Sequence, residues 1–90
     1  MTRVLLPTVL RADAGGNKHV EVNADTVGRA LVELTNAYPE LRGQLFSEDG
    51  ALRNHVNVFV GDENIRDRED LQTVLNPHDE VLIVPALAGG

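Results

Sequence analysis

One stretch of this sequence has the spacing of an amphipathic helix that is long enough to lie across a sheet. Its apolar residues recur at helical intervals and form one stripe: Val27, Leu31, Leu34 and Tyr38. Asp25 or Thr26 can accept a hydrogen bond from a free N–H of the first turn, and Pro39 cannot continue the helix. Arg29 and Glu33 are four residues apart and can pair on the solvent side. The sequence therefore predicts one main helix, which begins after Asp25 or Thr26 and ends near Tyr38.

Two segments before this helix have the alternation and β-branched content of strands. Residues 3–9 are apolar and contain Pro7, which suits a strand end or an edge because it donates no ladder hydrogen bond. Residues 18–23 alternate cleanly between apolar and polar side chains. Residues 12–17 between them are rich in turn formers. The pattern predicts a hairpin whose strands are joined by a glycine turn.

The segments after the helix are shorter and more varied. Residues 39–46 predict a turn that packs three side chains against the core, namely Leu41, Leu45 and Phe46. Residues 55–60 predict a strand with its alternate valines on one face, and residues 65–66 a very short strand. The apolar positions at 71, 74 and 75 suggest one helical turn. Residues 80–86 are apolar on both faces, which is typical of a central strand.

The order of these elements is strand, strand, helix, strand, short strand, strand. It predicts an α+β domain over residues 1–86, in which one main helix packs across one face of a mixed sheet. This arrangement resembles the β-grasp of ubiquitin-like proteins. Residues 87–90 are expected to form a flexible C-terminal tail that ends in Gly89 and Gly90.

Composition narrows the classes of function. The formal net charge of −6 argues against a nucleic-acid partner, which requires a basic surface, and against an anionic membrane surface. The chain has no cysteine, so it has no disulfide and no thiolate ligand or nucleophile. A first strand explains the short apolar run near the N-terminus better than a signal peptide does. We expect a cytoplasmic protein.

No motif of an enzyme's own active site is present. The histidines lack metal-ligand spacing, and the acidic pairs in the predicted loops lack the alternation of a calcium loop. Ser47 is not flanked by the glycines of a nucleophile elbow. Gly15 and Gly16 are too few to cradle a phosphate. We therefore expect neither catalytic residues nor a metal or cofactor in this chain.

The two terminal glycines are the feature that suggests a function. Glycine has no Cβ and can pass through a slot that is too narrow for other residues. Residues Leu87, Ala88 and Gly89 would carry the Gly90 carboxylate away from the last strand. A carboxylate must be activated before a sulfur or amine can attack it. The working group would then be the Gly90 carboxylate, and it would react inside the active site of another protein.

Several motifs resemble those of the ubiquitin-like sulfur carriers, a group that includes the thiamine sulfur carrier and the small subunit of molybdopterin synthase. They are V-N-V-F-V-G-D-E-N-I-R at 56–66, L-Q-T-V-L at 71–75 and D-E-V-L-I-V-P-A-L-A-G-G at 79–90. The segments P-T-V-L-R at 7–11 and G-G-N-K at 15–18 are most similar to the sulfur carriers of cysteine biosynthesis. His78 departs from the family, which often has glycine there.

The resemblance implies a set of partner enzymes. An E1-like, ATP-dependent enzyme would adenylate Gly90, and a sulfur donor would convert it to a thiocarboxylate. A pyridoxal-phosphate-dependent cysteine synthase would accept the sulfur, and a metal-dependent peptidase would release cysteine. ATP and pyridoxal phosphate would be bound by these partners and not by this chain.

A docking surface follows from the predicted packing. If the helix covers the face that carries Val56, Val58 and Val60, then Phe59 points the other way, and ubiquitin-like geometry places Leu82 and Val84 beside it. These three residues are the predicted docking patch. Three alternatives remain open: a carrier that serves molybdopterin or secondary-metabolite synthesis, a protein modifier that joins Gly90 to lysine, and a binding module with an idle tail.

Overall fold

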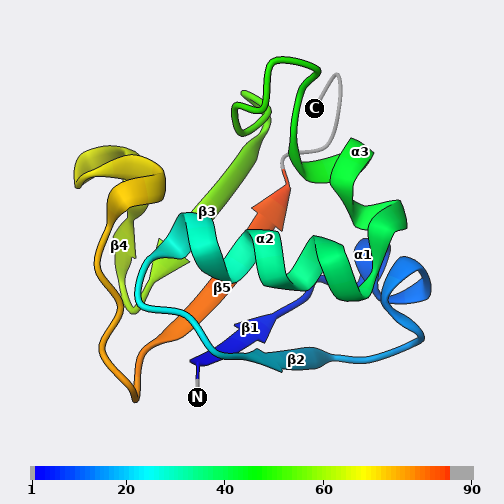
Figure 1. The fold of residues 1–90 in the computed structure, drawn as a ribbon, viewed down its shortest axis with the longest axis horizontal. Helices are drawn as coiled ribbons and strands as arrows, with labels where there is room; N and C mark the ends of the chain where they lie inside the picture. Colours follow the sequence, from blue (N-terminus) through cyan, green and yellow to red (C-terminus); the bar gives the residue numbers. More distant parts are fainter. Residues whose placement is uncertain (1, 86–90) are drawn as a thin grey trace.

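A mixed five-stranded sheet lies at the centre of the computed structural model, which describes residues 2–85 (Figure 1). Its strands are β1 (Thr2–Leu5), β2 (His19–Val22), β3 (Val56–Val60), β4 (Glu63–Asn64) and β5 (Glu80–Pro85). They lie side by side in the order β2-β1-β5-β3-β4. β5 pairs in parallel with β1 and antiparallel with β3. The prediction that the last strand is central is therefore confirmed.

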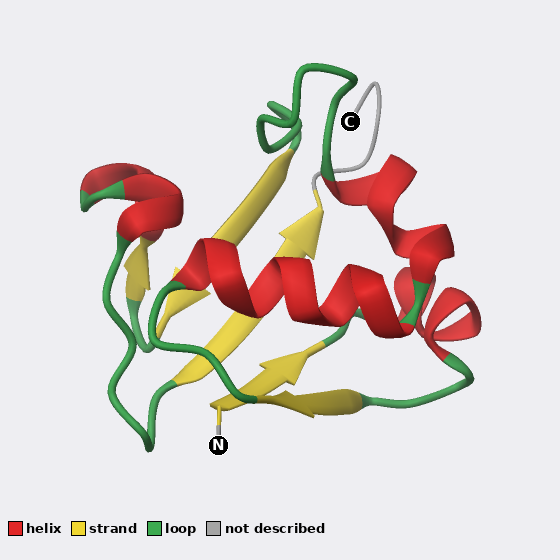
Figure 2. Cartoon of the chain, viewed as in Figure 1, coloured by secondary structure: helices red, strands yellow, loops and turns green. Residues whose placement is uncertain are grey.

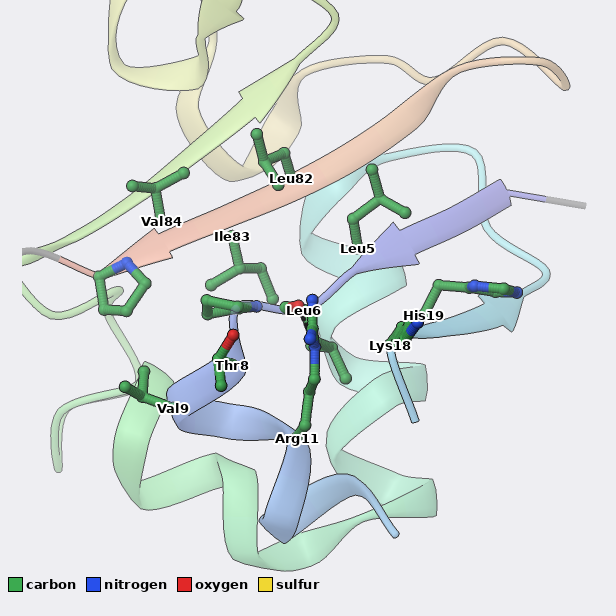
Figure 3. A pocket seen from close by; sticks show the side chains of 12 residues that line it. Leu5, Leu6, Thr8, Val9, Arg11, Lys18, His19, Leu82, Ile83 and Val84 are labelled. Carbon is green, nitrogen blue, oxygen red and sulfur yellow. Dashed lines mark hydrogen bonds between the residues drawn. The ribbon is translucent and has the colours of Figure 1, made fainter. Parts of the chain in front are cut away.

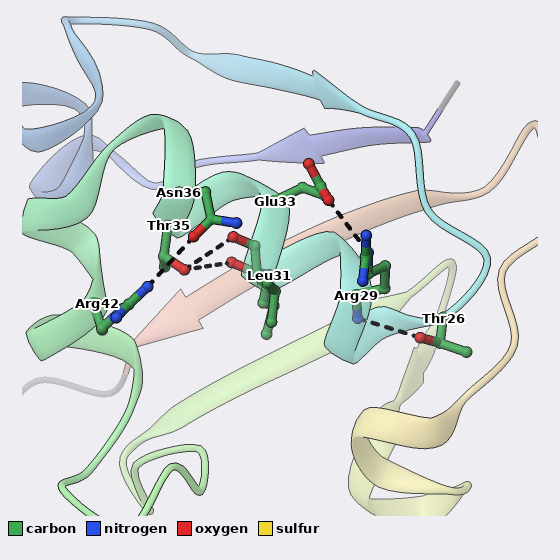
Figure 4. A network of polar contacts seen from close by, with 8 residues as sticks. Thr26, Arg29, Leu31, Glu33, Thr35, Asn36 and Arg42 are labelled. Atoms are coloured by element: carbon green, nitrogen blue, oxygen red, sulfur yellow. Dashed lines mark hydrogen bonds and ion pairs between the residues drawn. The ribbon is translucent and has the colours of Figure 1, made fainter.

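The main helix, α2 (Val27–Ala37), lies across one face of this sheet (Figure 2). The Thr26 hydroxyl accepts a hydrogen bond from the Arg29 N–H at 3.2 Å, so Thr26 and not Asp25 caps the helix. Arg29 Nε lies 3.2 Å from Glu33 Oε1, which confirms the predicted ion pair (Figure 4). Tyr38 is the C-terminal cap and Pro39 opens the next turn. The predicted helix is thus confirmed.

The core lies between α2 and the sheet face that the helix covers. Leu31 and Leu34 of α2 meet alternate side chains of the strands, among them Val4, Val58 and Ile83, and all five are fully buried. Burial in β1, β3 and β5 alternates residue by residue. No helix longer than four residues lies on the other face among the described residues. We call that other face the open face. The α+β architecture is confirmed.

The connection between β1 and β2 differs from the prediction. The strand predicted over residues 3–9 ends at Leu5, and a short helix, α1 (Thr8–Arg11), and a 3-10 turn, η1 (Ala12–Ala14), follow it. The antiparallel pairing of the two strands is confirmed, and Gly15 and Gly16 adopt positive φ in a turn before β2, but α1 and η1 also belong to the connection and were not predicted. The proline before α1 ends the ladder because it has no N–H, and the helix buries Leu10 in the core.

Two short helical segments follow α2, where a turn was predicted. They are η2 (Pro39–Leu41) and α3 (Arg42–Leu45). Leu41 and Leu45 are fully buried, and Phe46 packs against the core while partly exposed. The predicted packing of these three residues is confirmed.

The short elements between β3 and β5 also differ from the prediction. The very short strand is β4, two residues before the predicted Ile65 and Arg66, which belong to a 3-10 turn, η3 (Ile65–Asp67). The Asn64 side chain accepts a hydrogen bond from the Arg66 N–H at 3.0 Å and so starts this turn. Because this local hydrogen bond occupies the Arg66 N–H, the backbone turns at this point and the strand does not continue.

The helical turn predicted at Leu71, Val74 and Leu75 is wrong as well. A 3-10 turn, η4 (Asp70–Gln72), ends before Val74. Val74 instead forms an isolated bridge with Thr26 and is 60% exposed. The predicted boundary between residues 86 and 87 lies outside the described residues. Within residues 2–85 no helix has the length and apolar character needed to cross a membrane.

Candidate docking face and C-terminal site

The predicted reactive group, the Gly90 carboxylate, lies outside the described residues, as do Leu87, Ala88 and Gly89. The structure describes the strand that leads toward them. β5 pairs with β3 from Val81 to Pro85 and with β1 from Glu80 to Leu82. The chain after Pro85 therefore continues from a strand that pairs with both neighbours up to Leu82 and with β3 alone at its end.

The three residues of the predicted docking patch lie together on the open face. Phe59 and Leu82 are directly opposite each other in the β3–β5 pair, and Val84 is two residues further along β5, on the same side of the strand. Leu82 is 38% exposed and Val84 is 39% exposed, whereas Ile83 between them is fully buried. Phe59 is half-buried. The geometry thus provides a contiguous apolar surface beside the end of β5, and its docking role stays a prediction.

The patch continues across β1 into residues that the sequence pattern did not indicate. Leu5 lies opposite Leu82 in the parallel β1–β5 pair. Pro7 and Val9 line a groove that also includes Leu82 and Val84 (Figure 3), and Val9 is 61% exposed. An unpredicted helix carries Val9, so the residue pattern gave no sign that it joins this surface. Leu5 could have been assigned to this surface only if the register of the β1–β5 pair had been known from the sequence.

A polar cluster borders the patch at the start of β3. Asn57 lies opposite Val84 in the β3–β5 pair. Its side-chain oxygen accepts hydrogen bonds from Arg66 Nη1 at 3.0 Å and Asn64 Nδ2 at 3.3 Å. Arg66 also donates to the carbonyl oxygens of Asn54 and Arg53, at 3.2 and 2.9 Å. This cluster fixes the strand end that flanks Val84.

The histidines and acidic side chains of the described residues do not gather into a metal site. His19, His55 and His78 are all exposed. No group of three or more His, Cys, Asp or Glu side chains between residues 2 and 85 could hold a metal ion. The Ser47 hydroxyl hydrogen-bonds to Asp49 in an exposed loop and, together with the Ala51 N–H, lowers the pKa of that carboxyl. The Ser47 hydroxyl thus stabilises the turn over residues 47–51.

Comparison with known proteins agrees with this fold. A chain from the crystal structure of the Amycolatopsis orientalis BexX/CysO complex is similar to this protein with a TM-score of 0.91 and 32% identity, over 100% of both chains. The crystal structure of Mycobacterium tuberculosis CysO is similar with a TM-score of 0.88 and 34% identity, over 97% of this chain and 100% of that one. The fold is therefore a β-grasp.

Sequence comparison then identifies the family. The ThiS family profile matches residues 4–90, and the chain belongs to this family of ubiquitin-like proteins. An alignment of 89 residues with the "Sulfur carrier protein CysO" of Mycobacterium tuberculosis shows 38% identity and covers 97% of this chain and 96% of that protein. An alignment of 82 residues with "Small archaeal modifier protein 1" of Haloferax volcanii shows 34% identity and covers 88% of this chain and 90% of that protein.

Proposed function

We propose that this protein is a sulfur carrier and not an enzyme, and that its reactive group is the carboxylate of Gly90. One observation carries the proposal: the similarity to sulfur carrier proteins extends over 97% of the chain, and the family match runs through residue 90. The domain over residues 1–86 holds and presents the tail. Residues Leu87, Ala88 and Gly89 span the distance to the active site of a partner.

The chemistry starts with activation by an E1-like, ATP-dependent enzyme. A Gly90 carboxylate oxygen attacks the α-phosphorus of ATP, and pyrophosphate leaves. Sulfur at the oxidation level of hydrosulfide then attacks the acyl carbon, and AMP leaves. The product is a thiocarboxylate, formed with no net oxidation. The carrier has no thiol of its own that could capture the activated acyl group.

The docking patch of Phe59, Leu82 and Val84 is the surface on which we expect the activating enzyme to bind. Its two exposed side chains lie on the strand that leads into the tail. Apolar side chains at the centre of an interface supply most of its binding free energy. A partner that covers this patch would sit where the tail leaves the domain. The solved complex of CysO with BexX supports a role for protein partners in this family.

Cysteine synthesis is the acceptor pathway that we propose. The support is the 38% identity to sulfur carrier proteins named CysO and the resemblance of residues 7–11 and 15–18 described above. A pyridoxal-phosphate-dependent cysteine synthase would take the sulfur, and a metal-dependent peptidase would release cysteine from Gly90. Both cofactors belong to the partner enzymes. Location in the cytoplasm stays a prediction.

A protein modifier is the second candidate, and a specific observation favours it. The 34% identity to Small archaeal modifier protein 1 covers 88% of the chain. In this case Gly90 would form an isopeptide bond with a lysine of a target protein. The same adenylated intermediate serves both candidates, so the fate of the acyl group separates them.

Intact-mass measurement of the protein purified from its own cells tests the proposal. A fraction that is heavier by one sulfur-for-oxygen exchange, located on the C-terminal peptide, is the expected result. An additional cysteine adduct would identify the cysteine pathway. Lysine-linked conjugates without any sulfur exchange would favour the modifier instead.

Deletion of Gly90 provides the control. The truncated chain keeps every element described between residues 2 and 85, so it should fold as the full chain does. It should acquire neither sulfur nor cysteine. Unmodified full-length protein in sulfur-replete cells that express the activating enzyme would contradict the proposal.

A further inference from the structure

A groove of about 590 Å³ lies beside the docking patch, between α1 and the end of β5 (Figure 3). Its apolar lining includes Leu5, Val9, Leu82 and Val84. Pro85, the last described residue before the tail, also lines it. A partner segment that occupies this groove would therefore lie against the start of the tail.

The charged residues in this groove are all of one sign. Arg11 and Lys18 line it together with His19, whereas no Asp or Glu belongs to the lining. This contrasts with the whole chain, which carries a formal net charge of −6. The three ion pairs found between residues 2 and 85 involve neither Arg11 nor Lys18. Both cations thus remain available to a ligand with negative charge.

Arg11 has a defined position in the groove. Its Nε donates a hydrogen bond to the Leu6 carbonyl oxygen at 3.1 Å, and the side chain is half-buried. A guanidinium has further N–H donors and can bind a carboxylate through two of them. Lys18 is exposed and carries a mobile point charge. The pair combines one oriented and one adaptable cation.

From this combination we infer that the groove binds a segment of the activating enzyme in which apolar side chains alternate with carboxylates. The apolar side chains would cover Leu5, Val9 and Val84, and the carboxylates would meet Arg11 and Lys18. This inference rests on the proposed function, since it assigns the chemistry of the partner at the same face. It also explains how a strongly acidic carrier orients toward its enzyme, because a local cationic site steers an acidic segment to the tail.

Charge reversal tests the inference with the purified activating enzyme of the same organism as the probe. Association and dissociation rates are measured for Arg11→Glu and Lys18→Glu at low salt and at high salt. At low salt we expect the association rate to fall about tenfold for each variant, because charges at an interface act mainly on encounter. At roughly 0.5 M salt the difference should shrink to about twofold or less.

Three further variants separate charge from structure. Arg42→Glu changes the net charge by the same amount at an exposed site on α3 that does not line the groove, and it should bind as the wild type does. Arg11→Lys keeps the charge but loses the fixed geometry, and it should recover most of the association rate. Circular dichroism checks that each variant is folded; if Arg11→Glu does not fold, Lys18→Glu alone decides the test.

The outcomes distinguish this inference from the proposed function. If the wild type is adenylated and binds tightly while Lys18→Glu and Arg11→Glu bind equally well or better, the groove assignment is overturned and the carrier function stands. If Arg42→Glu loses as much as the groove variants, net charge and not the groove is responsible, which also overturns it. If the activating enzyme neither binds nor adenylates the wild type, the groove assignment and the proposed carrier function are both overturned.

Discussion

Truncation of Leu82 to alanine is expected to weaken both the fold and docking, because this side chain is only partly buried in the free protein. The change removes three carbons, which are worth about 2.4 kcal/mol when fully buried, at ~0.8 kcal/mol each. Leu82 is 38% exposed in the free protein. About 1.5 kcal/mol of that transfer free energy therefore belongs to folding and about 0.9 kcal/mol is left for a partner to gain. The folding share corresponds to a fall in Tm of roughly 6–12 °C.

The share left for the partner sets the expected loss of affinity. About 0.9 kcal/mol corresponds to a Kd that is raised roughly fourfold, and more if Leu82 fills a pocket on the partner. The assay is the Kd for the activating enzyme, measured well below the Tm so that every variant is folded. ATP–pyrophosphate exchange at low carrier concentration reports the same loss through kcat/KM.

Two control substitutions make the test specific. Ile83→Ala opens a cavity in the core and should cost about 2–5 kcal/mol of stability, with no change in Kd for the molecules that remain folded. Val32→Ala truncates a side chain on α2 that is 43% exposed and far from the open face, and it should leave Kd unchanged. A Leu82→Ala variant that is folded and binds as the wild type does would refute the docking patch.

Three further predictions concern the fold itself. Gly28→Ala should lower Tm, because the added Cβ would lie 2.9 Å from the Leu71 carbonyl oxygen and overpacking of this kind costs about 1–3 kcal/mol. This cost exceeds the gain of about 1 kcal/mol that alanine has over glycine in a helix. A raised Tm would contradict the prediction. In denaturant titrations, Thr26→Ala should lower the free energy of unfolding by about 1 kcal/mol, because it removes the α2 cap. Thr26→Ser retains a capping hydroxyl and should keep most of the wild-type stability. NMR titration should give Asp49 a pKa below the usual aspartate value, and Ser47→Ala should raise this pKa. Because the folded-state pKa is lowered, the ionised Asp49 carboxylate stabilises the fold above the unfolded-state pKa. This stabilisation is lost as the pH falls through the folded-state pKa.

The helix and the central strand could be predicted because their signals are local and agree with one another. The apolar stripe of α2, its N-terminal cap and the proline that follows it all indicate the same boundaries. The apolar run of β5 has no charged residue between Glu80 and Pro85, and such a run is typical of a central strand. The reactive role proposed for Gly90 and its tail rests on the sequence, and these residues lie outside the described part of the chain.

The connections could not be predicted because tertiary contacts decide them. The apolar pattern of residues 8–11 does not distinguish a helix from a strand. These residues form α1 because Leu10 fills the core and Arg11 donates a hydrogen bond to the Leu6 carbonyl oxygen. Val74 has the spacing of a helical turn with Leu71, but its backbone bridges to Thr26. The cationic groove was missed for the same reason, since only α1 brings Arg11 near β5.

The two apolar faces of β5 have different physical explanations, and this difference connects the fold to the function. Val81 and Ile83 are fully buried because α2 covers them. Leu82 and Val84 are equally apolar, yet they keep more than a third of their surface exposed. Stability of the isolated domain does not require leucine and valine there, because polar side chains on the open face of a sheet would avoid exposed apolar surface. The proposed activating enzyme would remove this surface from water, and it would then lie against the end of β5, the strand that leads toward the tail.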